Sequence, residues 1–336
     1  MRIWFNRGFS LAPIAQAMLA ADSSLEVLVS VGEGRPVYSG PTETFEEPDL
    51  EPSEYVDWVR DQIARRQIDV FVPTRLREHF YDADLPCRVH FPCSKSNYLV
   101  IEDKQAFSDA TANEPFHLPT WPASSADELE ERLALFRAWH DESLPCVKPR
   151  KGVNGHGFWK LPKDTAPSAH LLHPEFHTMR SDVFIAALRI QEREEPIAPL
   201  VLMDYLPGPE ISFDVLAHEG QILKYVARTK FDRRQSIQSP HFLESEAAVL
   251  AARFMLYGLV NLQFRKAIDG SWKILEINAR PAGGSIYAED YGAGLIADWG
   301  GLLSGRLTAN DIKPVKIDIE FETTSIRRLI EQKEAA

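Results

Sequence analysis

Several features that would assign a protein to a particular class are scarce or missing in this sequence. There are three cysteines in 336 residues, Cys87, Cys93 and Cys146, and their odd number and wide spacing exclude a disulfide framework. No apolar run approaches the roughly 18 residues that a membrane helix needs. The apolar stretch at the N-terminus is also too short for a secretory signal. We therefore expect a protein of the reducing cytoplasm that does not associate with membranes.

Two nucleotide-binding fingerprints are missing as well. The P-loop pattern G-x-x-x-x-G-K-[ST] does not occur, and the first turn, residues 7–10, has one glycine instead of G-x-G-x-x-G. These absences exclude a Walker-type NTPase and a nicotinamide-binding first domain. The net charge of -12 argues against a nonspecific nucleic-acid binder, because phosphate backbones require clustered Lys and Arg.

The composition, with 44% apolar and 26% charged residues, is that of an ordinary globular enzyme, and the length suffices for two or three subdomains.

The first 92 residues alternate apolar runs, typical of strands, with helical spacing. The strand-like runs are at 2–6, 25–31 and 68–72, and the helical ones reach residue 21 and cover 54–66. This βαβ rhythm predicts a small parallel sheet, a Rossmann-like scaffold.

The rest of the chain mixes helices with hairpin strands. Ser125 and Glu128 suggest a capping box at the start of a charged helix. The predicted helices cover 94–113, 125–139, 179–193 and 243–257, and the predicted strands cover 146–148, 200–206, 210–216, 222–228, 259–266 and 274–280. The expected fold class is therefore α/β followed by α+β.

The most informative tract runs from Leu275 to Gly284. In a strand, alternate side chains share a face, so Glu276, Asn278 and Arg280 point one way while Leu275 and Ile277 point toward a core. Oxygen ligands beside a permanent cation suit a hard metal ion that carries phosphates. The tract therefore indicates a site that uses ATP.

Four segments occur in a fixed order: Asp103-Lys104; Val147-Lys148-Pro149 with a glycine-rich loop at 151–157; 203–210; and 261–264 followed by 275–280. Together they resemble the ATP-grasp superfamily, closest to its carbamoyl-phosphate-synthase-like and D-alanine-ligase-like carboxylate–amine ligases. The resemblance implies a Rossmann-like pre-ATP-grasp domain over 1–92 and a two-lobed ATP-grasp fold. Its core would comprise 93–114 and 201–330, and its lid 115–200.

The resemblance also implies roles for single residues. Lys104 and Lys148 would reach the nucleotide phosphates, and Arg280 and Arg228 would steady the transferred phosphoryl group. The other nucleotide-binding positions would be Gly152, Gly155, His156 and Gly157 in the lid loop, Asp204, Tyr205 and Leu206 beside the adenine, and Glu210 near the ribose. Magnesium, with manganese as the alternative ion, would be bound by Gln263, Glu276 and Asn278. Substrate contacts would come from Lys230, Gly283, Gly284 and Arg75.

Two positions depart from the usual pattern of that superfamily. Gln263 stands where many members have Glu, and Asn154 and His156 stand in the lid loop where glycine is more usual.

The activity that the resemblance implies is ATP-dependent ligation. A small-molecule or peptide carboxylate would be activated as an acyl phosphate and joined to an amine, releasing ADP and phosphate. The partners would be these small molecules, and a homodimer stays open because dimers are common in the superfamily. The alternatives are a small-molecule kinase on the same scaffold and a non-catalytic nucleotide-binding module.

Overall fold

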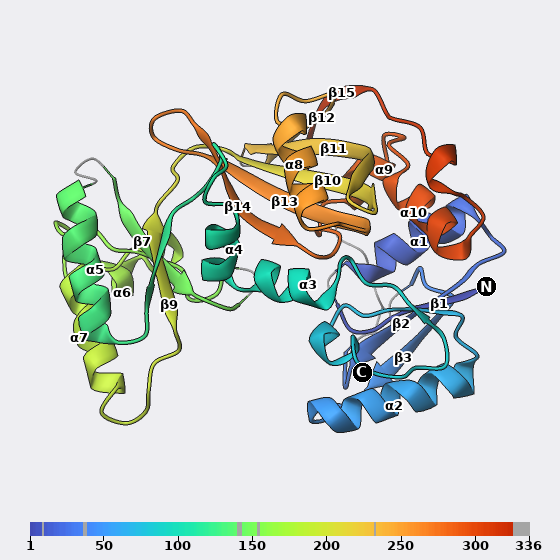
Figure 1. Cartoon of the computed structure of the whole chain (residues 1–336), viewed down its shortest axis with the longest axis horizontal. Coiled ribbons are helices and arrows are strands. Elements are labelled where there is room, and N and C mark those ends of the chain that lie inside the picture. Colours follow the sequence, from blue (N-terminus) through green and yellow to red (C-terminus); the bar gives the residue numbers. More distant parts are fainter. Residues whose placement is uncertain (9, 36–38, 140–142, 153–154, 232, 325–336) are drawn as a thin grey trace, which may run out of the picture.

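The computed structural model describes residues 1–8, 10–35, 39–139, 143–152, 155–231 and 233–324. Its strands form three sheets of five, six and four strands. Figure 1 shows the four-stranded sheet with its helices at one end of the molecule, and the six-stranded sheet between this end and the N-terminal unit. In the described part of the chain, no helix combines the length and the apolar character needed to cross a bilayer.

The N-terminal unit is a parallel sheet of order β3-β2-β1-β4-β5, which confirms the predicted βαβ pattern. Its elements are β1 (Arg2–Phe5), α1 (Leu11–Ala21), β2 (Glu26–Gly32), β3 (Glu43–Glu47), α2 (Pro52–Arg66), β4 (Val70–Val72), the 3₁₀ helix η1 (Arg77–His79) and β5 (Arg88–Val89). Trp4 packs with Tyr55 of α2 on one face, whereas Ile3 and Phe5 pack with α1 on the other, as alternation along a strand requires. β3 and β5 escaped prediction because one is acidic and the other has two residues.

The middle of the chain forms an antiparallel sheet of order β6-β9-β7-β8. Its elements are β6 (Thr120–Ala123), α5 (Ala126–Trp139), β7 (Pro145–Pro149), β8 (Trp159–Lys160), α6 (Ala169–Leu172), η2 (Pro174–Phe176), α7 (Ser181–Gln191) and β9 (Leu200–Asp204). Leu133 of α5 and Ile185 of α7 share an apolar cluster with Val147 and Leu202 of the sheet. The predicted boundary at residue 200 assigned β9 to the core, but β9 pairs with β6 and β7. Strand partners this far apart in sequence leave no local signal.

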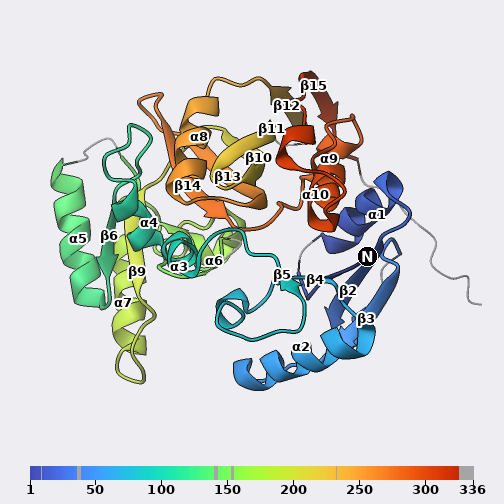
Figure 2. The ribbon, with the colours of Figure 1, turned by 45° about the vertical axis from the view of Figure 1, so that its right-hand side comes forward.

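The C-terminal part forms a sheet of order β14-β13-β10-β11-β12-β15. Its elements are β10 (Glu210–His218), β11 (Gln221–Phe231), β12 (Arg234–Ser239), α8 (Glu244–Arg253), β13 (Gly258–Lys266), β14 (Trp272–Asn278), α9 (Ile286–Glu289), α10 (Leu295–Ser304), η3 (Ala309–Asp311) and β15 (Ile317–Glu322). Figure 2 shows α9 and α10 between this sheet and α1. β12, β15, α9 and α10 were not predicted from the sequence.

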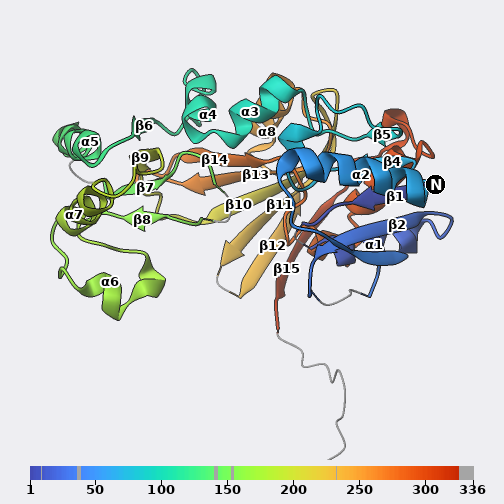
Figure 3. The same cartoon turned by 90° about the horizontal axis from the view of Figure 1, so that it is seen from below.

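Alternation along β10 gives this sheet two different faces. Phe213 and Val215 belong to an apolar cluster under α3 (Lys95–Glu102), α4 (Lys104–Ala110) and α8, and Figure 3 shows these helices along one face. Ser212 and Asp214, at the alternate positions, are fully buried on the opposite face. The polar face of the sheet is where the candidate site lies.

One long helix was expected over 94–113, but the structure has two, and they meet at Asp103. The Oδ1 of Asp103 accepts hydrogen bonds from the backbone N–H groups of Gln105 and Ala106, both at 3.1 Å. An Asp side chain satisfies the first amides of a helix better than it continues one. Asp103 therefore starts α4 and places Lys104 at the head of that helix.

The predicted capping box at the start of α5 is partly confirmed. Ser125 Oγ accepts from the Glu128 N–H at 3.1 Å, as expected. Glu128 reaches back to the backbone N–H of Ser124 at 2.7 Å, one residue earlier than the box predicts.

Candidate active site

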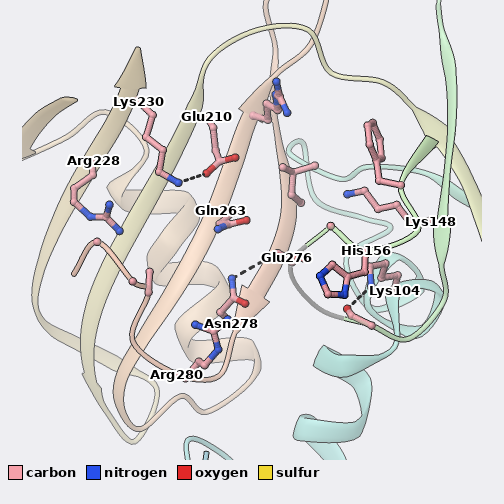
Figure 4. Close-up of a pocket in the computed structure, with 18 of the residues that line it drawn as sticks. Lys104, Lys148, His156, Glu210, Arg228, Lys230, Gln263, Glu276, Asn278 and Arg280 are labelled. Atoms are coloured by element: carbon pink, nitrogen blue, oxygen red, sulfur yellow. Dashed lines mark hydrogen bonds and ion pairs between the residues drawn. The ribbon is translucent and has the colours of Figure 1, made fainter. Parts of the chain in front are cut away.

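A cleft of about 660 Å³ lies between the four-stranded and the six-stranded sheet, and Figure 4 shows the side chains that face it. Most of the predicted site residues line it. They are Lys104, Lys148, Gly152, Gly155, His156, Glu210, Arg228, Lys230, Gln263, Glu276, Asn278, Arg280, Gly283 and Gly284. These residues come from α4, β7, the lid loop, four core strands and the loop after β14, so folding brings together positions that are far apart in the sequence.

The proposed metal ligands lie on the neighbouring strands β13 and β14. Gln263 is the register partner of Glu276, and the Nδ2 of Asn278 donates to Glu276 Oε1 at 3.2 Å. One carboxylate and two amides supply oxygen donors, which fits magnesium, an ion that keeps further positions for water and phosphate oxygens. The described residues contain no cluster of three His, Cys, Asp or Glu side chains, so the donor chemistry does not resemble a zinc site.

The prediction that Leu275 points to the same face as Ile277 is wrong. The register between β13 and β14 shifts between Gln263 and Phe264, so that Phe264 pairs with Ile274 while Gln263 pairs with Glu276. Leu275 is the extra residue of this β-bulge, and it lines the cleft. A bulge re-aims the side chains on one side of it, which a strict period of two cannot anticipate.

Lys104, at the start of α4, and Lys148, on β7, both face the cleft, and Figure 4 shows them on the same side of it. The Nζ of Lys104 donates to the carbonyl oxygen of Gly152 at 2.9 Å, while the Nζ of Lys148 lies 5.8 Å from the ring centre of Phe158. Burial lowers the pKa of Lys104, and the carboxylate of Glu276 counteracts this effect. Two ammonium groups beside one carboxylate leave the cleft suited to a polyanion.

Arg280 lies just beyond the end of β14 and lines the cleft together with the proposed metal ligands Glu276 and Asn278. Its Nη1 donates to the carbonyl of Pro281 at 3.1 Å. Burial, reinforced by the nearby Arg77, lowers the pKa of Arg280, although a guanidinium stays charged at neutral pH. A desolvated cation is well placed to bind charge that develops in the cleft.

Two further predicted cations of the cleft are already paired with carboxylates. Arg228, of which 1% is exposed, binds Asp214 through Nε to Oδ2 at 2.5 Å and Nη2 to Oδ1 at 3.3 Å. Lys230 donates to Glu210 Oε1 at 2.7 Å, and these two residues are register partners on β10 and β11. Glu210, which was predicted to lie near the ribose, and Lys230, which was predicted to contact the substrate, therefore form an ion pair with each other.

The lid loop is only partly within the described residues, because Val153 and Asn154 lie outside them. Gly152, Gly155 and His156 line the cleft, whereas Gly157 does not. Gly157 has φ 72°, and a Cβ there would lie 2.7 Å from Pro149 Cγ. The structure therefore requires glycine at 157 for close packing against β7, and the predicted contact with the nucleotide has no support from its position.

Four other predicted residues also lie off the cleft: Asp204, Tyr205, Leu206 and Arg75. The backbone N–H of Tyr205 donates to the carbonyl of Leu144 at 2.8 Å, so it is already engaged. Leu206 is 4% exposed, in an apolar cluster against which the cleft residues Phe158 and Leu275 pack.

Arg75 sits in the N-terminal unit, where its Nη2 donates to Asp49 at 2.7 Å and its Nη1 lies 3.6 Å from the buried Glu47. Its charge is balanced there, away from the cleft.

The cleft is also lined by residues that were assigned no role from the sequence: Phe158, His177, Gln235, Arg265, Leu275 and Ala282. Tyr287 lines it as well, within the segment 283–291 that the resemblance implies for the acceptor. Arg265 follows Gln263 by two residues on one strand, so alternation could have found it. Gln235 and Tyr287 lie on β12 and α9, which were not predicted. The Oε1 of Gln235 is buried without a hydrogen-bond partner in the part of the chain that the structure describes.

Comparison with known proteins agrees with this architecture. A family model described as "ATP-grasp in the biosynthetic pathway with Ter operon" matches residues 196–324. None of the curated proteins matches the chain significantly.

Three solved structures illustrate the similarity. Biotin carboxylase from Campylobacter jejuni, solved as a beta-gamma-ATP complex, is 13% identical with a TM-score of 0.63, over 93% of this chain and 73% of that one. L-amino acid ligase from Bacillus licheniformis is 12% identical with a TM-score of 0.61, over 94% of this chain and 77% of that one. The biotin carboxylase domain dimer of Hydrogenobacter thermophilus 2-oxoglutarate carboxylase, solved with MgADP and bicarbonate, is 14% identical with a TM-score of 0.63, over 93% of this chain and 72% of that one. The resemblance to the ATP-grasp superfamily that was predicted from the sequence is confirmed.

Proposed function

We propose that this chain, which has the ATP-grasp fold, is an ATP-dependent ligase that activates a carboxylate and joins it to an amine. One observation carries the proposal: Glu276, Asn278 and Gln263 face the same cleft as Lys104, Lys148 and Arg280. A set of oxygen donors surrounded by cations matches the needs of a metal–triphosphate.

ATP is the proposed nucleotide and magnesium the proposed ion. The solved structures with ATP or ADP, one of them with MgADP, support this assignment. Lys104 and Lys148 would bind the phosphate oxygens, and Phe158 and Leu275 would pack against the adenine. When bound at Glu276, Asn278 and Gln263, magnesium would neutralise β- and γ-phosphate oxygens.

The proposed chemistry has two steps. The substrate carboxylate attacks the γ-phosphorus, so that an acyl O–P bond forms and the bond to the β-phosphate oxygen breaks, releasing ADP. An amine then attacks the acyl carbon, phosphate leaves, and the amine nitrogen loses a proton to solvent. In both steps the protein contributes position and fixed positive charge, chiefly from Arg280 and Arg228, because phosphoryl transfer needs little covalent help from side chains.

We propose that the segment 115–200, together with the rest of β9, acts as a lid over the core, which would comprise 93–114 and the remainder of 201–330 and follow the first domain, 1–92. The hydrogen bond from Lys104 to Gly152 supports this role, since it ties the lid loop to the core beside the phosphate site. Lid closure would exclude the water that hydrolyses an acyl phosphate. The acceptor would bind beside Gly283 and Gly284, with Lys230 and Gln235 nearby.

The test is to incubate the protein with ATP, magnesium, hydroxylamine and a panel of small carboxylic acids, including amino acids. An acyl phosphate reacts with hydroxylamine, so a hydroxamate that requires both ATP and the acid supports the ligase. Reactions that lack the acid serve as the control. A stable phosphorylated product without hydroxamate would instead support a kinase. Calorimetry that detects no magnesium-dependent ATP binding would contradict both activities and the nucleotide-binding module.

A further inference from the structure

A buried carboxylate beneath the cleft joins several elements of the proposed site. Asp214 on β10 has no exposed surface. Its Oδ2 accepts from Arg228, and its Oδ1 accepts from Ser285 Oγ at 2.6 Å and from Asn261 Nδ2 at 3.0 Å. These bonds charge-compensate the carboxylate and fill its acceptor positions.

The connection to Ser285 fixes the loop that follows β14. Ser285 Oγ, which donates to Asp214, also accepts from the backbone N–H of Ala282 at 2.9 Å. Gly283 and Gly284, which lie between Ala282 and Ser285 in the chain, form part of the cleft wall. Asp214 therefore anchors this wall from below.

Gly284 and Arg228 fit closely. A Cβ at position 284 would lie 2.3 Å from Nη1 of Arg228. Asp214 binds Nε and Nη2 of this guanidinium, and the remaining nitrogen, Nη1, is the atom nearest to the Cβ position of residue 284. The guanidinium and the loop can both occupy these positions only while residue 284 lacks a side chain.

On its other side, the network reaches the proposed metal ligands. Asn261, which donates to Asp214, is the register partner of Asn278, and the Nδ2 of Asn278 lies 3.5 Å from Asn261 Oδ1 and 3.2 Å from Glu276 Oε1. The polar contacts thus run from Glu276 to Asp214 and on to Arg228 and Ser285.

We infer that Asp214 is a positioning residue that sets Arg228 and the Gly283–Gly284 wall in register with the metal-binding strand. Asp214 itself lies too deep to touch a substrate. It acts by fixing the guanidinium of Arg228, which lines the cleft and would add positive charge beside the transferred phosphoryl group, while nucleotide binding itself would depend on Lys104, Lys148 and the strand β14. This inference rests on the proposed function and adds a residue to its machinery.

The test compares the affinity for MgADP with and without aluminium fluoride, which together with MgADP mimics a transferring phosphoryl group. Calorimetry on the full chain measures both constants for the wild type and for Ser285→Ala and Asp214→Asn. Gly284→Ala should displace Arg228 while Asp214 stays in place. Ser181→Ala is the control, because Ser181 is also buried and accepts from a charged side chain, Arg137 Nη2 at 2.8 Å, but lies off the cleft.

We expect MgADP to bind the three test variants as it binds the wild type, while the gain in affinity from aluminium fluoride falls by roughly tenfold, as for a lost hydrogen bond to a charged group. Ser181→Ala should keep the full gain. Ser285→Ala conserves most of the side-chain volume, so it decides the matter if Asp214→Asn does not fold.

Three results would overturn the inference. If the test variants retain the full gain in affinity from aluminium fluoride, Asp214 does not position Arg228 for phosphoryl transfer. An equal loss of affinity for MgADP alone would show that Asp214 supports the fold or the nucleotide site instead. If aluminium fluoride does not raise the affinity of the wild type for MgADP, Arg228 does not stabilise a transferring phosphoryl group. In contrast, a wild type that does not bind MgADP would refute the proposed function itself.

Discussion

The Nζ of Lys104 donates to the carbonyl oxygen of Gly152 at 2.9 Å, which joins the first residue of α4 to the lid loop. The ammonium group proposed to bind phosphate is thus already bound to the lid. In the proposed function a nucleotide would share or replace this contact, which would couple nucleotide binding to the position of the lid loop through one side chain. Burial also lowers the pKa of Lys104, and an arriving triphosphate should raise it again.

Substitution Lys104→Met should weaken nucleotide binding while sparing the fold. It removes one charge-assisted hydrogen bond to phosphate, which predicts a 10- to 100-fold rise (about 1.4–3 kcal/mol) in the Kd for MgATP. Isothermal titration calorimetry measures this directly. Lys273→Met is the control, because Lys273 also donates to a backbone carbonyl, that of Pro115 at 3.2 Å, but lies off the cleft. Equal affinities in the two variants would remove Lys104 from the phosphate site.

Glu276 supplies the only carboxylate of the proposed metal ligands, so Glu276→Gln should weaken the metal more than the nucleotide. We expect Mn²⁺ to bind about tenfold or more weakly in the presence of ADP, because a neutral amide replaces the charged ligand. Electron paramagnetic resonance of free Mn²⁺ follows this titration. Glu320→Gln, an exposed position on β15, should leave Mn²⁺ affinity unchanged. The ligand assignment is wrong if Glu276→Gln behaves like this control.

The two described glycines in the turn of the lid loop should respond differently to alanine. Gly155 and Gly157 both have positive φ, 67° and 72°, but an added Cβ meets nothing within 4 Å at 155 and Pro149 Cγ at 2.7 Å at 157. Gly155→Ala should therefore cost only the backbone strain, about 1 kcal/mol in the free energy of unfolding. Gly157→Ala should cost roughly 2 kcal/mol or more, since the loop must also move away from β7. Urea denaturation measures the free energy of unfolding of both variants, and equal losses would contradict the predicted clash with Pro149.

The sequence predicted the site where local rules determine geometry. Alternation along one strand placed Glu276 and Asn278 on one face, and the position of Lys148 before the glycine-rich loop placed it at the cleft. It failed at Leu275, because the bulge depends on how β13 pairs with β14, and at Asp103, where a local hydrogen bond ended a helix that apolar spacing alone would have continued.

Asp214 and Ser285 could not have been predicted to meet. They lie on β10 and on the loop after β14, and the polar contact between them is created by the sheet order β14-β13-β10. Similarly, Arg75 was a candidate because the resemblance implies substrate contacts from the first domain, yet Glu47 and Asp49 balance its charge. Such pairings are properties of the fold and carry no trace in the neighbouring sequence.

The ion pair between Asp103 and Arg150 should make stability depend on pH in the acid range. Arg150 Nε lies 2.8 Å from both oxygens of Asp103. Although burial opposes it, this contact and the helix amides lower the pKa of Asp103 below its ordinary 3.8. A depressed carboxyl pKa stabilises the fold above the unfolded-state pKa, and this contribution is lost as the pH falls through the folded-state pKa.

Asp103→Asn retains a side chain that caps α4 but removes the charge. We expect the variant to be less stable at pH 7 by about 1 kcal/mol, a modest value because Arg150 is partly exposed. The difference from the wild type should shrink as the pH falls below about 4. Urea denaturation at several pH values measures it. A difference that stays constant into the acid range would assign the effect to the cap and not to the ion pair.

Arg280 should matter for turnover far more than for binding ATP. It is the cation at the end of β14, half-buried beside Glu276 and Asn278, so Arg280→Ala removes charge stabilisation at the phosphorus where the reaction occurs. We expect turnover with an acid identified in the hydroxamate screen to fall by about 10²–10³-fold, with little change in MgATP affinity. Arg189→Ala is the control, since Arg189 binds Asp127 and Glu130 on the lid surface and should leave turnover intact. Near-normal turnover in Arg280→Ala would show that another cation, foremost Arg228, stabilises the transferred group alone.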